Sequence, residues 1–181
     1  MKYRGFFVND EAPALTGWID SKYPRTKTHN THGFVADFWQ HVFEALLRLR
    51  ANYLWPAMWG NMFNVDDILN QPLADAYGIV MGSSHTEPLA RATNEWSVFG
   101  NGVEKWQFTS NNATLTDYWR QGVLRARPYD TLYTIGMRGY GDTALSEDIA
   151  TEQLEHVVAT QRKLLTEIHG DASKVPQMWC L

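Results

Sequence analysis

Acidic, basic and aromatic side chains that can act on a sugar follow four short apolar runs of this sequence. Asn9, Asp10 and Glu11 follow the first run, Trp59 and Asn61 the second, His85 and Glu87 the third, and Arg138 and Asp142 the fourth. Two carboxyl groups in one cleft can cleave a glycosidic bond, because one protonates the leaving oxygen while the other activates water or attacks carbon. These residues therefore indicate a site for sugar hydrolysis.

The guanidinium of Arg138 allows two interpretations. Its planar fork can hold a carboxylate through two parallel hydrogen bonds, which would suit an acidic sugar such as a uronic acid. It can also pair with Asp142 or Glu11 and join two loops, since ion pairs are common near strand ends. The sequence leaves both interpretations open.

His85 and Glu87 lie two residues apart, and imidazole plus carboxylate is a familiar pair of metal ligands. A metal-dependent hydrolase using His85, Asp10 and Glu87 is therefore one hypothesis. The spacing is not that of a helical metal motif, however, and no second histidine lies nearby in the sequence. We expect no metal and no cofactor, with His85 binding sugar hydroxyls. Glu87 either lines the site or caps the helix that follows it.

The elements that must position these residues alternate along the chain. Apolar runs predict strands at residues 3–8, 52–58, 79–82, 132–137 and 177–181. Helical spacing of apolar residues, with its start and stop signals, predicts helices at 34–50, 65–77 (capped by Asn64), 89–99, 114–127 and 149–169. Residues 20–33 are expected to form a loop. We interpret the four histidines His29, His32, His156 and His169 as surface residues.

Strands that alternate with helices favour parallel β/α units, in either an open doubly wound sheet or an eightfold barrel. The open sheet usually carries a phosphate-binding glycine loop after its first strand, but residues 9–13 hold Asn-Asp-Glu-Ala-Pro, without a glycine. The fold class expected is therefore α/β, a partial (β/α)8 TIM barrel with about five of eight strands. In such barrels the reactive side chains lie at the C-terminal ends of the strands.

Composition excludes several other classes of protein. The 181 residues carry 16 basic and 20 acidic side chains, so the net charge is −4, and no basic block is present for nucleic-acid binding. No apolar stretch approaches the ~20 residues that span a membrane. A single cysteine, Cys180, rules out an internal disulfide and is expected to be a buried strand residue. The N-terminus lacks the apolar segment of a signal peptide.

Four ordered segments resemble glycoside hydrolase family 115. They are residues 4–18 (RGFFVNDEAPALTGW), 52–61 (NYLWPAMWGN), 77–88 (YGIVMGSSHTEP) and 135–139 (IGMRG). The resemblance implies an inverting xylan α-1,2-glucuronidase that releases glucuronic acid or its 4-O-methyl ether from glucuronoxylan. It also implies a secreted enzyme with a (β/α)8 catalytic barrel, which in its full-length form is a homodimer.

Carried over by residue, the resemblance places Asp142 on a catalytic carboxylate and Asp10 on a second acidic position of the active site. Arg138 and His85 fall on residues that line the sugar site. Asp20 stands where the family is expected to have a glutamate, and Tyr140 replaces an acidic residue. We expect Glu11, Asp20, Glu87, Trp59 and Asn61 to contact substrate together with Arg138 and His85.

The resemblance also predicts that residues 1–181 form the N-terminal part of the catalytic domain, truncated at the fifth strand, where a further catalytic glutamate would follow. On this basis we expect an incomplete active site and an unclosed barrel that aggregates or is inactive when expressed alone. The alternative is a non-catalytic remnant or a carbohydrate-binding shell that keeps Trp59 and Arg138.

Overall fold

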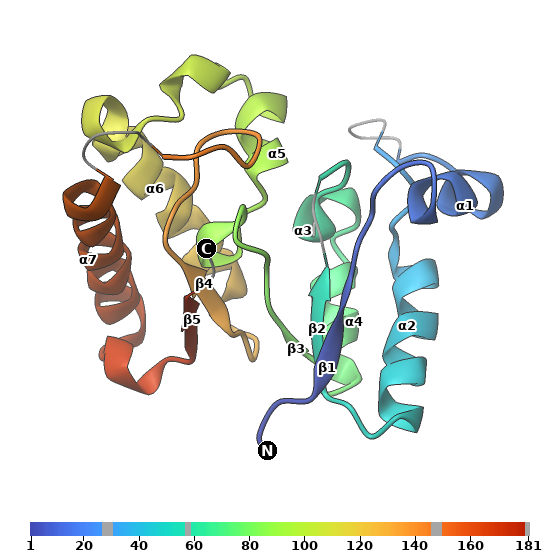
Figure 1. The fold of residues 1–181 in the computed structure, drawn as a ribbon. Coiled ribbons are helices and arrows are strands. Elements are labelled where there is room, and N and C mark those ends of the chain that lie inside the picture. Colours follow the sequence, from blue (N-terminus) through green and yellow to red (C-terminus); the bar gives the residue numbers. More distant parts are fainter. Residues whose placement is uncertain (27–30, 57–58, 146–149, 180–181) are drawn as a thin grey trace. The chain divides into compact units, whose positions relative to one another are not determined.

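The computed structural model describes residues 1–26, 31–56, 59–145 and 150–179 of the chain. These residues form two compact units, Met1–Gly82 and Ser83–Leu181. Figure 1 follows the elements of each unit along the sequence. No helix of the described residues is long and apolar enough to cross a membrane.

The first unit is built on a parallel three-stranded sheet with the order β1-β2-β3. Its strands are β1 (Gly5–Val8), β2 (Tyr53–Pro56) and β3 (Val80–Met81). Each coincides with a predicted strand. In β1, Phe6 and Phe7 are 40 % and 46 % exposed, although strands of parallel sheets are ordinarily covered on both faces.

Four helices complete the first unit: α1 (Leu15–Lys22), α2 (Ala36–Arg48), α3 (Phe63–Asp66) and α4 (Asn70–Ala76). Helix α2 was predicted from the helical spacing of Phe34, Phe38, Val42, Leu46 and Leu49. Phe38 and Leu46 are buried in the helix, whereas Leu49 follows it and is 71 % exposed. Helix α1 was missed, and the predicted loop 20–33 begins inside it. Only Thr16 and Ile19 of α1 are buried, so the apolar signal is short.

The single helix predicted at 65–77 is wrong, because it is divided into α3 and α4. Asp67 ends the helical path, since its carboxylate accepts hydrogen bonds from the backbone N–H groups of Leu69 (2.9 Å) and Ala36 (3.0 Å). Short polar side chains compete with helix geometry in this way. Asn64 is not the N-cap that we predicted, since α3 already begins at Phe63 after Met62.

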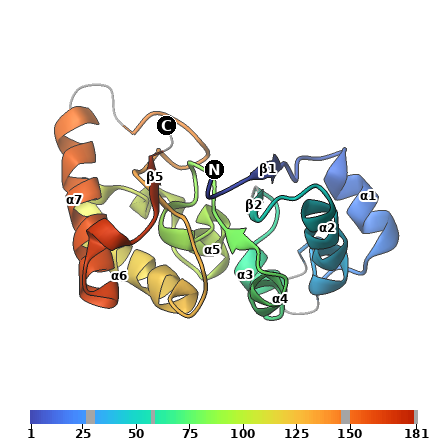
Figure 2. The ribbon, with the colours of Figure 1, turned by 90° about the horizontal axis from the view of Figure 1, so that it is seen from below.

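The second unit contains a parallel pair of strands, β4 (Tyr133–Ile135) and β5 (Gln177–Trp179). Three α-helices accompany them: α5 (Thr93–Val98), α6 (Phe108–Ala126) and α7 (Ala150–His169). Short 3₁₀ turns occupy Pro88–Ala90, Val103–Lys105 and Ala172–Lys174. Figure 2 shows α6 and α7 together beside the β4–β5 pair.

Two predicted helices of the second unit need correction. The helix at 89–99 is interrupted, because Leu89 and Ala90 have φ angles of 55° and 58°, in the left-handed region that a helix cannot contain. Helix α6 begins at Phe108, six residues before the predicted start. Its first turns carry the polar run Thr-Ser-Asn-Asn and a non-helical Asn111, which hide the helix from an apolar pattern.

Aromatic rings form the centre of the second unit's core. Trp96 lies edge to face with Trp106 at 5.3 Å and with Tyr118 at 5.1 Å between ring centroids. Helix α7 adds Val157, Leu164 and Leu165 to the same buried cluster. Such edge-to-face pairs favour one arrangement of the rings, so this core sets α5 and α6 in a fixed geometry.

The predicted α/β class with parallel strands is confirmed. The five described strands lie in two small sheets, however, one in each unit. The partial (β/α)8 barrel therefore stays a prediction. The expectations for His29 and Cys180 lie outside the described residues.

Candidate active site

The C-terminal end of β4 leads to an ion-pair cluster in the second unit, formed by His85, Arg138 and Asp142. One carboxylate oxygen of Asp142, Oδ1, lies 3.0 Å from Nε2 of His85 and 2.5 Å from Nε of Arg138. Nη2 of Arg138 also donates to the backbone carbonyl of Asp142 at 3.3 Å. All three side chains are about one third exposed, so the cluster is open to water.

A tight turn after β4 presents Asp142. Gly139 and Thr143 form an antiparallel bridge across it, in which the N–H of Gly139 donates to the carbonyl of Thr143 at 3.0 Å. Gly141 and Asp142 both have positive φ angles, of 71° and 64°. A positive φ is uncommon for a residue other than glycine, and such strain clusters at functional sites.

Two buried side chains hydrogen-bond to the backbone at and just before Arg138. The amide of Gln161, on α7, accepts from the N–H of Gly136 at 2.7 Å and donates to its carbonyl at 2.8 Å. The indole of Trp106 donates to the carbonyl of Arg138 at 3.0 Å. These bonds fix the backbone where it leaves β4.

The loop that carries His85 closes around the carboxylate of Glu87. Oε2 of Glu87 accepts from the N–H of Ser84 at 2.8 Å and from its hydroxyl, and Oε1 accepts from the hydroxyl of Thr86 at 2.6 Å. The hydroxyl of Thr134, on β4, donates to the carbonyl of Ser83. Glu87 is buried, so its carboxylate does not face solvent. Its hydrogen bonds instead shape the loop that carries His85.

In the first unit, Asp10 follows β1 and is 2 % exposed. Its carboxylate accepts from the N–H groups of Gly60 (2.9 Å) and Trp59 (3.3 Å) and from the side-chain amide of Asn61. Burial raises the pKa of Asp10 above its ordinary value, and these three donors oppose the shift. A carboxyl group with a raised pKa is suited to hold a proton.

A pocket of about 420 Å³ adjoins Asp10. Glu11, His32 and the partly exposed ring of Trp59 also line it. Nδ1 of His32 lies 2.8 Å from the carboxylate of Asp20, which also pairs with Arg25 at 3.2 Å. The hydrogen bond with His32 is the main cause that lowers the pKa of Asp20. Asp20 therefore orients His32 at the edge of the pocket.

The family model for glycosyl hydrolase family 115 matches residues 1–181. The chain belongs to glycosyl hydrolase family 115. It is also similar to a solved structure described as a novel family GH115 4-O-methyl-α-glucuronidase with specificity for decorated arabinogalactans. That match has 33 % sequence identity and a TM-score of 0.83, and it covers 97 % of this chain and 24 % of that chain. No curated protein matches the chain.

The family 115 chain brings most of the predicted site residues into two groups, one in each unit. His85, Arg138 and Asp142 form the first, and Asp10, Glu11, Trp59 and Asn61 the second. Of the two interpretations of Arg138, its pairing with Asp142 is observed. No group of three His, Cys, Asp or Glu side chains suited to a metal ion occurs in the described residues.

One pocket residue was missed by sequence reasoning. His32 was interpreted as a surface residue, but it lines the pocket and contacts Asp20. The two residues are 12 positions apart, and no pattern in the sequence signals their contact. His156 is exposed as predicted, and His169 is partly buried against the ring of Tyr133.

Proposed function

We propose that the protein hydrolyses α-1,2-linked glucuronic acid or 4-O-methylglucuronic acid side chains of glucuronoxylan with inversion. The observation that carries this proposal is the carboxylate of Asp142, which lies beside both His85 and Arg138 in a cluster open to water. Among the described residues, both contacts fall on Oδ1. In this proposal Oδ2 is the oxygen that orients the attacking water. Membership of family 115 supports the reaction class.

Inversion requires a general acid and a general base whose carboxyl groups are roughly 6.5–9.5 Å apart. In the proposed scheme Asp142 is the base that activates water. The family resemblance places Asp10 on a second acidic position of the active site, so in this proposal it is a candidate for the acid. The family resemblance offers a further glutamate, outside residues 1–181, as another partner for Asp142.

Recognition of the acidic sugar is assigned to Arg138 and His85. Arg138 uses Nε and Nη2 on Asp142, so in this proposal Nη1 and His85 contact the uronate and its hydroxyls. In this proposal Glu11 and the ring of Trp59 contact substrate, whereas Asn61, which is buried, holds the carboxylate of Asp10 instead of contacting sugar. Asp20 acts through His32, and Glu87 acts by shaping the loop of His85.

The proposal extends to the whole enzyme. The chain spans about a quarter of the length of the solved relative. We propose that residues 1–181 supply one part of a (β/α)8 barrel, in which closure would cover the exposed rings of Phe6 and Phe7. We further propose that the enzyme acts outside the cell and is a homodimer.

The test is release of acidic sugar from glucuronoxylan by the full-length enzyme, with decorated arabinogalactan as the second substrate because the solved relative is described as specific for it. The Asp142→Ala variant is expected to lose activity on both. The matched control is Asp130→Ala, which changes an exposed aspartate of the same unit. Full activity of Asp142→Ala would refute the assigned role, and release from arabinogalactan alone would refute the xylan assignment.

A further inference from the structure

A second pocket lies in the unit Ser83–Leu181, and none of the cluster residues His85, Arg138 and Asp142 lines it. Its volume is about 380 Å³. That size falls within the ~300–1,000 Å³ range of small-molecule sites. One wall is a stripe of α6 formed by Thr114, Asp117, Tyr118 and Gln121, which share a helical face through their spacing of three, four and seven residues.

Phe99 and Asn101, which follow α5, also line the pocket. Phe99 is 50 % exposed although its ring is apolar. The backbone fixes it, because Gly100 has a φ of 86°, its N–H donates to Ser97 at 3.1 Å, and the N–H of Asn101 donates to Trp96 at 3.0 Å. These are the two hydrogen bonds of a Schellman motif, so the ring of Phe99 is presented by a rigid helix end.

The base of the pocket is preformed. The guanidinium of Arg91 lies 4.1 Å from the centroid of the Tyr118 ring, a cation–π contact. The hydroxyl of Tyr118 donates to the carbonyl of Ala92 at 2.5 Å, next to the start of α5. Since α5 and α6 are joined through these side chains, a ligand would find the pocket already shaped.

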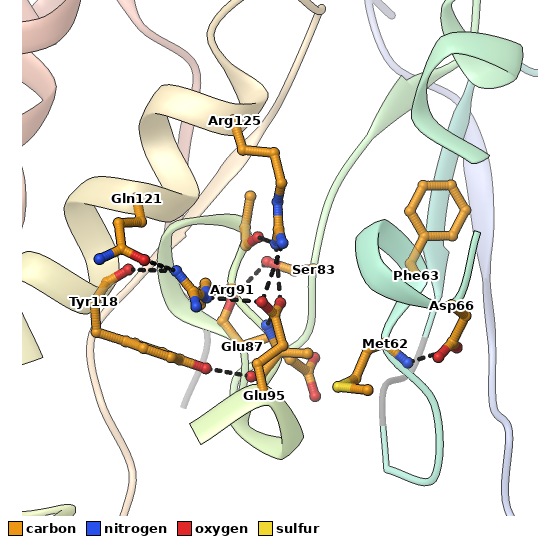
Figure 3. A network of polar contacts seen from close by, with 12 residues as sticks. Met62, Phe63, Asp66, Ser83, Glu87, Arg91, Glu95, Tyr118, Gln121 and Arg125 are labelled. Atoms are coloured by element: carbon orange, nitrogen blue, oxygen red, sulfur yellow. Dashed lines mark hydrogen bonds and ion pairs between the residues drawn. The ribbon is translucent and has the colours of Figure 1, made fainter. Parts of the chain in front are cut away.

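The charges around the pocket are matched within the protein. Arg91 pairs with Glu95 at 2.8 Å and donates to the side-chain oxygen of Gln121 at 3.1 Å, as Figure 3 shows. Glu95 also binds Arg125 at 2.9 Å. The amide of Gln121 donates to the carboxylate of Asp117 at 2.8 Å. An acidic ligand would therefore meet Arg91, whose charge Glu95 already balances, and the exposed carboxylate of Asp117, which would repel it. The hydroxyl groups of a neutral ligand would instead meet the carboxylate of Asp117 and the amide of Gln121 as hydrogen-bond partners.

We propose that this pocket binds a neutral sugar unit of a polysaccharide backbone, with one sugar face on Phe99 and its hydroxyls on Asp117, Gln121 and Asn101. The identity of the polymer rests on the proposed function, but the neutrality of the sugar rests on the pocket itself. Such a site would hold the main chain of a substrate whose acidic side group is cleaved elsewhere on the protein.

The test is calorimetric titration of the protein with three probes: xylohexaose, β-1,3-galactohexaose and free glucuronic acid. The two neutral oligosaccharides distinguish a xylan from a galactan backbone. Phe99→Ala is expected to weaken binding of the neutral probe roughly two- to tenfold, the factor that an aromatic contact contributes. Leu124→Ala is the matched control, because Leu124 is also 50 % exposed, lies on α6 and does not line the pocket.

Asp117→Ala provides an independent variant, since Asp117 is exposed and its loss removes an acceptor without opening the core. Binding of one neutral probe that is weakened by Phe99→Ala and Asp117→Ala but kept by Leu124→Ala supports the site, even if no glucuronic acid release is found. Absence of neutral-sugar binding, equal binding by all variants, or a pocket that takes only glucuronic acid would overturn it.

Discussion

Replacement of Glu95 by glutamine should destabilise the second unit strongly. Glu95 is 1 % exposed, and its carboxylate lies 2.8 Å from Nε of Arg91 and 2.9 Å from Nη2 of Arg125. Glutamine keeps the shape and one acceptor oxygen but removes the charge that compensates two arginines. Removal of one partner of a buried ion pair costs about 3–5 kcal/mol. In a protein of this size that loss lowers the melting temperature by roughly 6–20 °C.

Glu44→Gln is the matched control, because Glu44 also pairs with an arginine. Its partner is Arg48, at 2.6 Å on the same helix, α2. Both of those side chains are mostly exposed, and exposed pairs at this spacing contribute only about 0.3–0.5 kcal/mol. Differential scanning calorimetry of the two variants gives the comparison. A melting temperature for Glu95→Gln within 1 °C of the Glu44→Gln value would show that the buried network contributes little, and would refute this reasoning.

Two further predictions concern packing and pH. Alanine at Gly122 in α6 would place its Cβ 2.5 Å from the carbonyl oxygen of Leu89. Overpacking of about 1–3 kcal/mol then outweighs the gain of about 0.5–1 kcal/mol that alanine brings over glycine in a helix, so Gly122→Ala should destabilise the protein. Gly17→Ala in α1 meets no atom within 4 Å and should stabilise the protein. Chemical denaturation measures both, and equal effects would contradict the prediction. Burial, with the charge of Arg127, lowers the pKa of His169, so the unfolded chain takes up the proton first and stability falls as pH drops below about 6.5. His169→Gln should reduce this loss between pH 7.5 and 5.5 in thermal scans; an unchanged pH profile would count against it.

Long elements with a buried face were predictable from the sequence. Helix α7 lies within one residue of its predicted start and ends where predicted, because its apolar residues repeat over 20 positions and Gly170 follows with a φ of 89°. The strand ends were also predictable, and with them the placement of Asp10 and Asp142. Short helices were not: α1 buries two side chains, which is too few for a period to appear.

Contacts between distant residues were beyond sequence reasoning. Glu95 meets Arg125, 30 positions away, through the approach of α5 to α6, and no local pattern marks that pair. Glu87 shows the opposite case, since the sequence placed it correctly after a strand but could not show that its carboxylate turns into its own loop. In both cases burial decides the partner, and burial is a property of the fold.

In the proposed function, the enzyme cleaves α-linked glucuronic acid side chains with inversion, using Asp142. Proton NMR of glucuronoxylan hydrolysis, recorded from the first minute after the protein is added, tests it most directly. The proposed mechanism predicts that the β-anomer of the released acid appears first and the α-anomer follows by mutarotation, with no release by Asp142→Ala. Initial release of the α-anomer, or unchanged release by the variant, would contradict it.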